Sequence, residues 1–224
     1  MKSKIEDLIG RVALISIFMF FAIYGLSGLE KLLADPWAND SWLLDVVVRV
    51  AGFLFLLLIV ATTLIRLPAK NTAAGWEPRV SAIVGTFFTL VLIVLPKGQI
   101  SAEAKIVAAA IIITGTGLSV YCLYWLGRSF SVMAHARKLV TQGPYSVARH
   151  PLYAAEMVTL LGVTLANFSV WATLVVAITI AFQFRRMANE ERVLRATFPE
   201  YDDYARRVPM IVPALASRRL RESE

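Results

Sequence analysis

Two short polar segments flank a long apolar stretch in the C-terminal half of the chain, and they contain residue types that can do chemistry. Residues 149–153 read Arg-His-Pro-Leu-Tyr before the stretch, and Glu190 and Glu191 follow it. Histidine and tyrosine can donate hydrogen bonds and carboxylates accept them, so together they can hold a polar ligand. Tyr201 and Tyr204 come shortly after the glutamates. This pattern indicates a catalytic site at a membrane surface.

The same residue types also have a structural interpretation. Charged side chains gather at membrane interfaces, where long side chains keep their heads in water. Arg149 and His150 would then form an interfacial anchor pair, and Glu190 and Glu191 a solvated helix face. Residue types alone favour this interpretation, so a catalytic site needs support from the rest of the chain.

The composition places these residues in a membrane protein. Hydrophobic residues make up 58% of the 224 residues, charged residues make up 17%, and the mean hydropathy is +0.65. Soluble domains are seldom so apolar. No linker or low-complexity tract divides the chain. We therefore expect one domain over residues 1–224, with membrane helices in 1–126 and the polar segments in 127–224.

Uncharged runs locate the membrane helices, because a spanning helix needs about 20 apolar residues. The sequence predicts an all-α, polytopic protein with about four spanning helices and a C-terminal helical hairpin. The runs cover residues 12–29, 50–65 (with the helix starting near 43), 80–95, 106–126 and 157–184.

The last run is too long for one crossing. At ~1.5 Å per residue it would reach about 42 Å, whereas the hydrocarbon core is about 30 Å thick. Its middle contains Asn167 and Ser169, which favour turns. We therefore expect two helices that form a hairpin and return to the same side. A single crossing would also put His150 and Glu190 on opposite faces of the membrane.

The distribution of charge predicts the orientation. With both termini inside, most of the 23 lysines and arginines fall on the cytoplasmic side, as the positive-inside tendency expects. We expect the site on that side as well. The net charge of +7 then reflects topology and anionic lipid headgroups, and we expect no nucleic-acid partner.

Small residues in the fourth run have structural interpretations. Cys122 is the only cysteine, so the sequence predicts neither an intramolecular disulfide nor a cysteine metal cluster, and we expect no bound metal. A buried, inert thiol is expected there. Gly115 and Gly117 are expected to allow close packing between helices.

The order and spacing of many residues resemble the integral membrane S-adenosylmethionine-dependent methyltransferases, which include isoprenylcysteine carboxyl methyltransferase and, more distantly, phospholipid methyltransferases. The resemblance covers roughly the last ninety residues and departs from the family pattern at Ala155 and Pro199, where glycine is common. The connection to Tyr201 is also one residue shorter than the commonest form. The matching residues are Gly127, Arg128, Leu139, Val140, Gly143, Pro144, Tyr145, Arg149, His150, Pro151, Tyr153, Arg186, Glu190, Glu191, Leu194, Phe198, Tyr201, Tyr204, Val208, Pro209 and Pro213.

This resemblance implies a cofactor, S-adenosyl-L-methionine, bound by residues in 127–224. It implies that Arg186 lies at the methyl acceptor. It also implies that Glu190 binds the cofactor from one side. From the other side the implied cofactor-binding residues are Leu139, Val140, Tyr145, His150, Pro151, Leu152 and Tyr153.

The implied residue types suit the cofactor and the acceptor. The cofactor has a sulfonium, an ammonium and a carboxylate group, so it needs both acceptors and donors of hydrogen bonds. Arg186 and Glu190 are four residues apart and share one helix face. An arginine favours an anionic acceptor, for which no general base is required. An amine acceptor would instead benefit from a catalytic carboxylate such as Glu191.

The resemblance implies carboxyl O-methylation of an isoprenylated cysteine, or of a similar lipophilic substrate, among membrane lipids. Three alternatives stay open. The first is a phospholipid or other lipid N-methyltransferase, and the second is an NADPH-dependent membrane reductase, although no additional phosphate-binding glycine motif is present. The third is a noncatalytic scaffold or transporter, although the predicted spans contain almost no charged residues.

Overall fold

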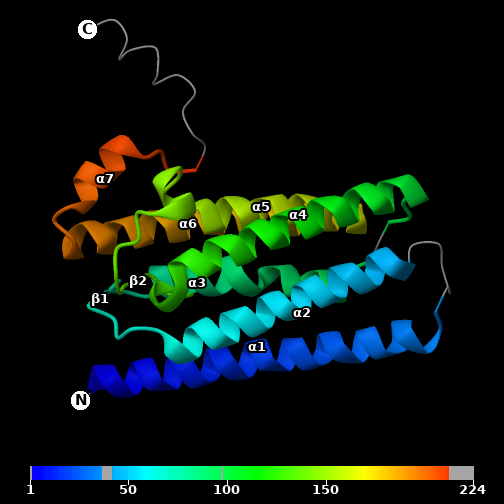
Figure 1. Cartoon of the computed structure of the whole chain (residues 1–224), viewed down its shortest axis with the longest axis horizontal. Coiled ribbons are helices and arrows are strands. Elements are labelled where there is room, and N and C mark those ends of the chain that lie inside the picture. Colours follow the sequence, from blue (N-terminus) through cyan, green and yellow to red (C-terminus); the bar gives the residue numbers. More distant parts are fainter. Residues whose placement is uncertain (1, 37–41, 97, 212–224) are drawn as a thin grey trace, which may run out of the picture.

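The computed structural model describes residues 2–36, 42–96 and 98–211, and it is almost entirely helical. Figure 1 shows the long helices running side by side along the longest axis of the molecule. The elements are α1 (Lys2–Ala34), α2 (Trp42–Ile65), β1 (Asn71–Thr72), α3 (Glu77–Phe87), η1 (Phe88–Ile93), α4 (Ala102–Leu126), η2 (Gly127–Ser129), β2 (His135–Ala136), η3 (Gly143–Ser146), α5 (Pro151–Asn167), α6 (Val170–Thr197) and α7 (Tyr201–Arg207).

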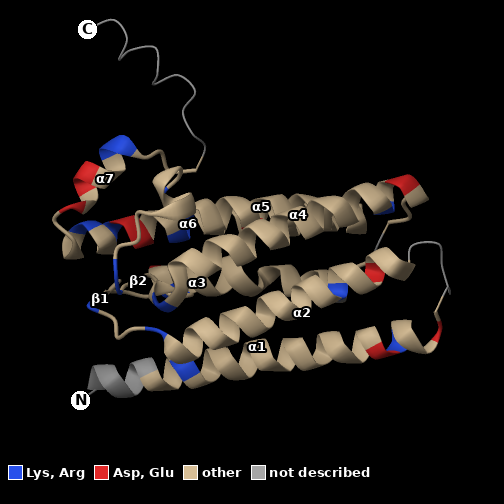
Figure 2. Ribbon diagram, in the orientation of Figure 1, with Lys and Arg blue, Asp and Glu red and all other residues tan. Residues whose placement is uncertain are grey.

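Four helices in the described part of the chain are long and apolar enough to cross a membrane, which confirms the prediction of an all-α polytopic protein. These candidate spans are Leu8–Ala34, Trp42–Ile65, Ala102–Ser129 and Val170–Thr197. Figure 2 shows that the middle parts of the long helices contain few charged residues, whereas charges gather towards the ends of the bundle.

The expected hairpin is present, but its second arm is longer than expected. Helix α5 ends at Asn167, and α6 begins at Val170 after Ser169, whose side chain accepts a hydrogen bond from the backbone N–H of Ala172. Such a cap satisfies one of the free N–H groups at a helix start. Because α6 continues to Thr197, its last turns carry Glu190 and Glu191 back beside the start of α5.

The third predicted span differs from expectation. Residues 80–95 do not form one continuous α-helix, because α3 ends at Phe87 and a 3₁₀ helix, η1, follows it. A 3₁₀ helix rises about 2.0 Å per residue against about 1.5 Å for an α-helix, so the two together still extend roughly 28 Å. Neither α3 nor η1 belongs to the four candidate spans of the described chain, so the prediction of a spanning helix at residues 80–95 is not confirmed.

Helices α4 and α5 pack closely through small residues, as Gly115 was expected to allow. A methyl group on Gly115 would overlap the backbone and side chain of Thr159, and one on Gly162 would lie 2.9 Å from the backbone nitrogen of Ile112. The same expectation was wrong for Gly117, because no atom lies within 4 Å of the position its methyl group would take.

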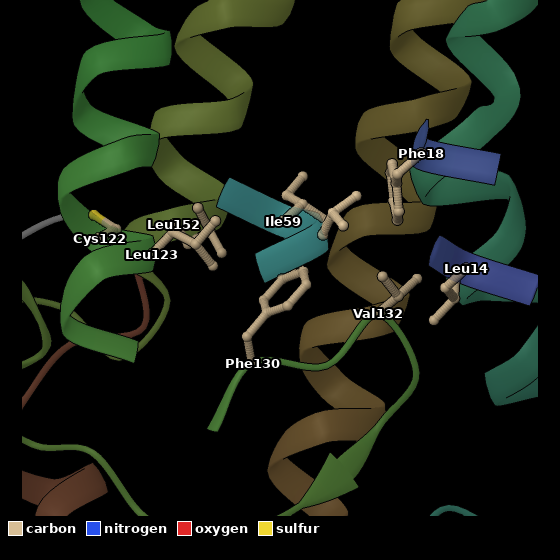
Figure 3. Close-up of a cluster of buried hydrophobic side chains, with 9 residues drawn as sticks. Leu14, Phe18, Ile59, Cys122, Leu123, Phe130, Val132 and Leu152 are labelled. Carbon is tan, nitrogen blue, oxygen red and sulfur yellow. The ribbon is translucent and has the colours of Figure 1, made fainter. Parts of the chain in front are cut away.

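A buried apolar cluster joins the N-terminal helices to the C-terminal part. Figure 3 shows side chains from α1, α2, α4, α5 and the loop after η2 pointing towards one another. Cys122 is 4% exposed within this cluster, in agreement with its expected role as a buried side chain. The cluster consists of Leu14, Phe18, Ile59, Val60, Cys122, Leu123, Phe130, Val132 and Leu152.

Short backbone pairings fix the loops that follow α2 and α4. Strands β1 and β2 are antiparallel, with Asn71 opposite Ala136 and Thr72 opposite His135. Arg128 donates from Nε to the carbonyl of Ile65 at 2.9 Å, which ties the end of α4 to the end of α2. These contacts hold the loop between η2 and η3 against the bundle, where it helps to form the site.

Candidate functional site

A cavity of about 520 Å³ lies between helices α1 to α6 and combines apolar and polar walls. The apolar wall comes mainly from the middle parts of α1 and α2 and from the end of α3, and phenylalanines are frequent in it: Phe18, Phe21, Phe53, Phe55 and Phe87 line the cavity. The polar wall comes from η3, the first turns of α5 and the second half of α6: Tyr145, His150, Tyr153, Glu156, Gln183, Arg186 and Glu190 line it.

The start of α5 and the end of α6 meet through a tyrosine and a glutamate. Tyr153 donates from its hydroxyl to Oε2 of Glu190 at 3.1 Å, and the two residues are 37 positions apart in the sequence. Pro151 occupies the first turn of α5, where a missing N–H costs nothing. The hairpin thus brings together the two polar segments that flank the apolar stretch in the sequence.

Arg186 lies beside Tyr153 and is buried. Its guanidinium carbon is 5.0 Å from the centre of the Tyr153 ring, and its Nη2 donates to the carbonyl of Val132 at 3.1 Å. Stacking on an aromatic face and bonding to a carbonyl hold a guanidinium in one orientation. Gly85 of α3 provides the space, because a methyl group there would be 2.7 Å from Cδ of Arg186.

Two polar residues that the sequence analysis did not identify also line the cavity. Glu156 follows Tyr153 by three residues on α5, and Gln183 precedes Arg186 by three residues on α6. Gln183 donates from Nε2 to Oε2 of Glu156 at 3.0 Å. Their spacing of three residues from Tyr153 and Arg186 could have identified them, because residues three apart share a helix face. However, Glu156 borders the apolar run 157–184 and Gln183 lies inside it, and that run predicts only a membrane hairpin.

Several buried polar atoms on the cavity wall have no hydrogen-bond partner within the described chain. They are the hydroxyl of Tyr145, Oε1 of Gln183 and Nε of Arg186. Buried polar groups are usually paired, because an unpaired one costs about 1–3 kcal/mol. Burial also raises the pKa of the Tyr145 hydroxyl well above its usual value, so that it stays a neutral donor. These atoms fit a polar ligand in the cavity.

This set of groups suits S-adenosylmethionine chemically. Carboxylates on Glu190 and Glu156 can face positive charge, and the hydroxyls of Tyr145 and Tyr153 can donate hydrogen bonds to a carboxylate or a ribose. The phenylalanine-rich wall can accept apolar surface. The residues present therefore fit the cofactor that the resemblance implies.

Glu191 lies in a different environment from Glu190, and it does not line the cavity in the described structure. Its Oε1 accepts from Nε and Nη2 of Arg149, both at 2.8 Å, and lies 3.2 Å from Nε2 of His150. Its Oε2 accepts from Arg195 at 3.1 Å. Because a carboxylate only accepts, Nε2 of His150 is the donor to it.

Arg149 connects this glutamate to the end of the described chain. Its Nη1 donates to the carbonyls of Ala205 and Val208 at 2.8 and 2.7 Å. The backbone N–H groups of Arg149 and His150 donate to the carbonyls of Pro209 and Met210 at 2.9 and 3.0 Å. The segment after α7 is thereby fastened over the start of α5.

The remaining residues proposed from the sequence lie at different distances from the cavity. Leu152 lines it and also belongs to the buried cluster, whereas Leu139 packs against a second buried cluster that includes Tyr201 and Tyr204. Pro151 lines a separate cavity of about 440 Å³ beside α4, and Val140 is half-buried outside the main cavity. In residues 2–36, 42–96 and 98–211 no group of three or more His, Cys, Asp or Glu side chains is placed to share a metal ion.

Comparison with known proteins identifies relatives of this chain. Residues 104–201, which include most of α4 and all of α5 and α6, match the phospholipid methyltransferase family. The chain is 32% identical over 109 residues to protein-S-isoprenylcysteine O-methyltransferase B of Arabidopsis thaliana, a match that covers 46% of this chain and 55% of the relative.

Two bacterial relatives have names that refer to metal resistance. The nickel-cobalt-cadmium resistance protein NccN of Alcaligenes xylosoxydans xylosoxydans is 33% identical over 137 residues, covering 57% of this chain and 62% of the relative. The cobalt-zinc-cadmium resistance protein CzcN of Cupriavidus metallidurans is 40% identical over 79 residues, covering 35% of this chain and 37% of the relative. The matched part thus spans about half the length of these relatives.

Proposed function

We propose that this chain, which belongs to the family of integral membrane methyltransferases, transfers a methyl group from S-adenosylmethionine to a lipophilic acceptor held in the membrane. The acceptor group we favour is a carboxylate, as on an isoprenylated cysteine. The name of the Arabidopsis relative refers to that substrate, and the arginine on the cavity wall suits an anion.

One observation carries the proposal: a single cavity joins a polar wall to an apolar wall within the membrane helices. The polar wall contains unpaired buried groups on Tyr145, Gln183 and Arg186. The apolar wall offers phenylalanine side chains to an aliphatic tail. Binding sites that are mostly apolar with a few placed polar groups are typical of small-molecule pockets. An amphiphile and a charged cofactor can both be accommodated by such a cavity.

Glu190 and Tyr153 are the residues that we propose to hold the cofactor, and they already hydrogen-bond to each other at 3.1 Å. Tyr145 and His150 complete the same wall, while Leu139, Val140, Pro151 and Leu152 remain proposals from the resemblance. When bound, S-adenosylmethionine supplies a methyl group on a positively charged sulfur. The carboxylate of Glu190 then offsets positive charge in a place from which bulk water is largely excluded.

Arg186 is the residue that we propose to position the acceptor. Its guanidinium is held by Tyr153 and by the Val132 carbonyl, so its orientation is set before a ligand binds. A preorganised donor costs little to use when a carboxylate arrives. Exclusion of water by the phenylalanine-rich wall strengthens the attraction between a carboxylate and this guanidinium. Such an acceptor needs no general base.

Methylation of a lipid amine is the second candidate, and one observation favours it. Glu156 adds a second carboxylate to the cavity wall, close to the acceptor side of the site. A carboxylate stabilises the positive charge that an amine gains when it is methylated. Glu191 is less suited to that role, because Arg149 and Arg195 already engage its oxygens.

We propose a cytoplasmic location for the polar wall and for both termini. The support is the charge bias described above, since lysines and arginines gather in the segments that share one side with the site. Modification of single introduced cysteines by a membrane-impermeant thiol reagent in intact cells tests this orientation. Accessibility of a cysteine at Glu200 from the outside would contradict it.

Binding calorimetry on the detergent-purified protein tests the proposed function. We expect S-adenosylmethionine and S-adenosylhomocysteine to bind the wild type, and Glu190→Gln to weaken both at least tenfold. Glu200→Gln is the matched control, because Glu200 is exposed outside the cavity, and it should bind like the wild type. Binding of NADPH in place of these ligands would move the chain to the reductases, and binding of none of them would remove the methyltransferase proposal.

A further inference from the structure

We infer that Glu156 and Gln183 form a specificity element that binds an N–H or O–H group of the methyl acceptor, next to the group that is methylated. This inference rests on the proposed function, since it concerns the acceptor of that reaction. It goes further because it names which feature of the acceptor is recognised and by which two residues.

Gln183 is buried, Glu156 is half-buried, and both residues face the cavity. Gln183 is 2% exposed, and both residues line the cavity wall. Gln183 donates from Nε2 to Oε2 of Glu156 at 3.0 Å. The other end of the same amide, Oε1, is buried and has no hydrogen-bond partner in the described chain. The amide therefore has one end in use and one end without a partner.

Glu156 determines which end of the Gln183 amide has no hydrogen-bond partner in the described chain. The Glu156 carboxyl oxygen accepts from the NH₂ group of Gln183, so this end of the amide faces Glu156. The carbonyl oxygen is then directed away from Glu156. Burying an oxygen without a donor is unfavourable, and a ligand that supplies the donor removes that cost. A ligand with only ether or ester oxygens at this point leaves the cost in place.

The position of the pair assigns it to the acceptor and not to the cofactor. Gln183 precedes Glu190 by seven residues on α6, which is about 10 Å at ~1.5 Å per residue. Glu156 lies about 4.5 Å beyond Tyr153 along α5, in the same direction. The pair therefore lies deeper in the bundle than the Tyr153–Glu190 contact that we propose to hold the cofactor.

The neighbours of the pair support this assignment. Thr159 and Leu160 of α5 and Thr179 of α6 continue the cavity wall beyond it. The hydroxyl of Thr179 already donates to the carbonyl of Val175, at 2.9 Å. At this depth, between the polar wall and the phenylalanines, Gln183 Oε1 is a buried acceptor without a donor in the described chain, and a ligand can supply that donor. The fitting ligand has an apolar tail, a methylated head group and an amide or amine N–H beside it.

Three farnesyl ligands test this inference by calorimetry on the full chain saturated with S-adenosylhomocysteine. N-acetyl-S-farnesylcysteine carries an amide N–H beside its carboxylate. Its N-methyl derivative lacks that hydrogen, and 3-(farnesylthio)propionate lacks the whole amide. We expect the wild type to bind the first ligand about tenfold more tightly than either of the others, which corresponds to about 1.4 kcal/mol.

Gln183→Met keeps the size of the side chain and removes the acceptor oxygen, so we expect it to bind all three ligands with similar affinity. Glu156→Met is the second variant, because it lets the amide of Gln183 rotate, and it should reduce the preference. Thr164→Val is the control on α5. Its hydroxyl bonds only to the carbonyl of Leu160 and it does not line the cavity, so the tenfold preference should remain.

The outcomes separate this inference from the proposed function. A wild type without the preference, or a Gln183→Met protein that keeps it, overturns the role of the pair. Failure of the wild type to bind any of the three ligands overturns it as well. The wild type could also fail to bind S-adenosylhomocysteine but still prefer N-acetyl-S-farnesylcysteine when it is measured without S-adenosylhomocysteine. That result would remove the proposed methyl transfer and would leave recognition of the N–H group by Glu156 and Gln183 in place.

Discussion

Arg149 contacts a single carboxylate oxygen of Glu191 with two of its nitrogens, Nε and Nη2, each at 2.8 Å. The side chains are 13% and 8% exposed, so the pair is largely removed from water. Arg149 also reaches the carbonyls of Ala205 and Val208. The pair thus joins the start of α5, α6, α7 and the segment after α7, and Glu191 also bonds to His150 on the cavity wall.

Removing Glu191 should destabilise the protein more than it affects any chemical step. Glu191→Ala leaves the Arg149 guanidinium buried without its carboxylate, which typically costs about 3–5 kcal/mol. We expect a clear fall in the thermal unfolding temperature in detergent. Arg206→Ala is the control, because it removes an exposed ion pair with Asp203, and such pairs contribute at most about 1 kcal/mol. Equal stability of the two variants would contradict a structural role for Glu191.

Alanine substitutions at two glycines of α4, Gly115 and Gly117, should have different effects on the unfolding temperature. Gly115→Ala places a methyl group against Thr159 of α5, so we expect α4 and α5 to move apart and the unfolding temperature to fall. Gly117→Ala meets no atom within 4 Å, and alanine favours a helix by about 1 kcal/mol over glycine. It should leave stability unchanged or raise it. Similar melting curves for both variants would contradict the observed packing.

The site could be predicted from the sequence in part. The hairpin followed from the length of its apolar run and from Asn167 and Ser169, because one crossing could not accommodate 28 residues. It brings Tyr153 and Glu190 within hydrogen-bonding distance. The break of the third span at Phe87 could not be predicted, since hydropathy does not distinguish an α-helix from a 3₁₀ helix.

Other features depend on tertiary contacts that spacing alone does not reveal. Glu190 and Glu191 are neighbours in the sequence, but a helix points successive side chains in different directions, and only Glu190 lines the cavity. The different environments of the two glutamates follow from where Arg149 lies. Glu156 and Gln183 were not recognised because hydropathy identifies residues 157–184 only as a membrane hairpin and does not show which of its faces lines a cavity.

Gly85 should matter for activity although it lies on α3, whereas Arg186, which we propose to position the methyl acceptor, lies on α6. A methyl group at this position would be 2.7 Å from Cδ of Arg186 and would displace that side chain. We expect Gly85→Ala to reduce methyl transfer at least tenfold, because small displacements of a positioning group are costly. Binding of S-adenosylhomocysteine should change less than threefold, since the Tyr153–Glu190 hydrogen bond involves neither Gly85 nor Arg186.

Methyl transfer with radiolabelled cofactor and calorimetry on the same preparations measure these two effects. Arg186→Lys should behave like Gly85→Ala, because a lysine keeps the charge but loses the planar group that stacks on Tyr153. Full activity of Gly85→Ala would show that Arg186 tolerates displacement. It would therefore argue against Arg186 as the residue that positions the acceptor.

Tyr204 should make stability depend on pH in the alkaline range. It donates from its hydroxyl to the carbonyl of Tyr145 at 2.6 Å, and burial raises the pKa of Tyr204 to about 12, against an opposing effect of Arg149. An unfolded tyrosine has a pKa of about 10. Between pH 10 and 12 the unfolded chain therefore loses a proton that the folded chain keeps, so the stability of the fold decreases as pH rises.

Tyr204→Phe removes both the hydrogen bond and this titration. At neutral pH we expect the variant to be less stable by about 1 kcal/mol, since a buried acceptor on Tyr145 loses its donor. From pH 10 to 12 its unfolding temperature should fall less than that of the wild type, so the two curves approach each other. Burial also raises the pKa of Tyr201, so some alkaline dependence should persist in the variant. Parallel curves over this range would mean that Tyr204 is not held protonated by the fold.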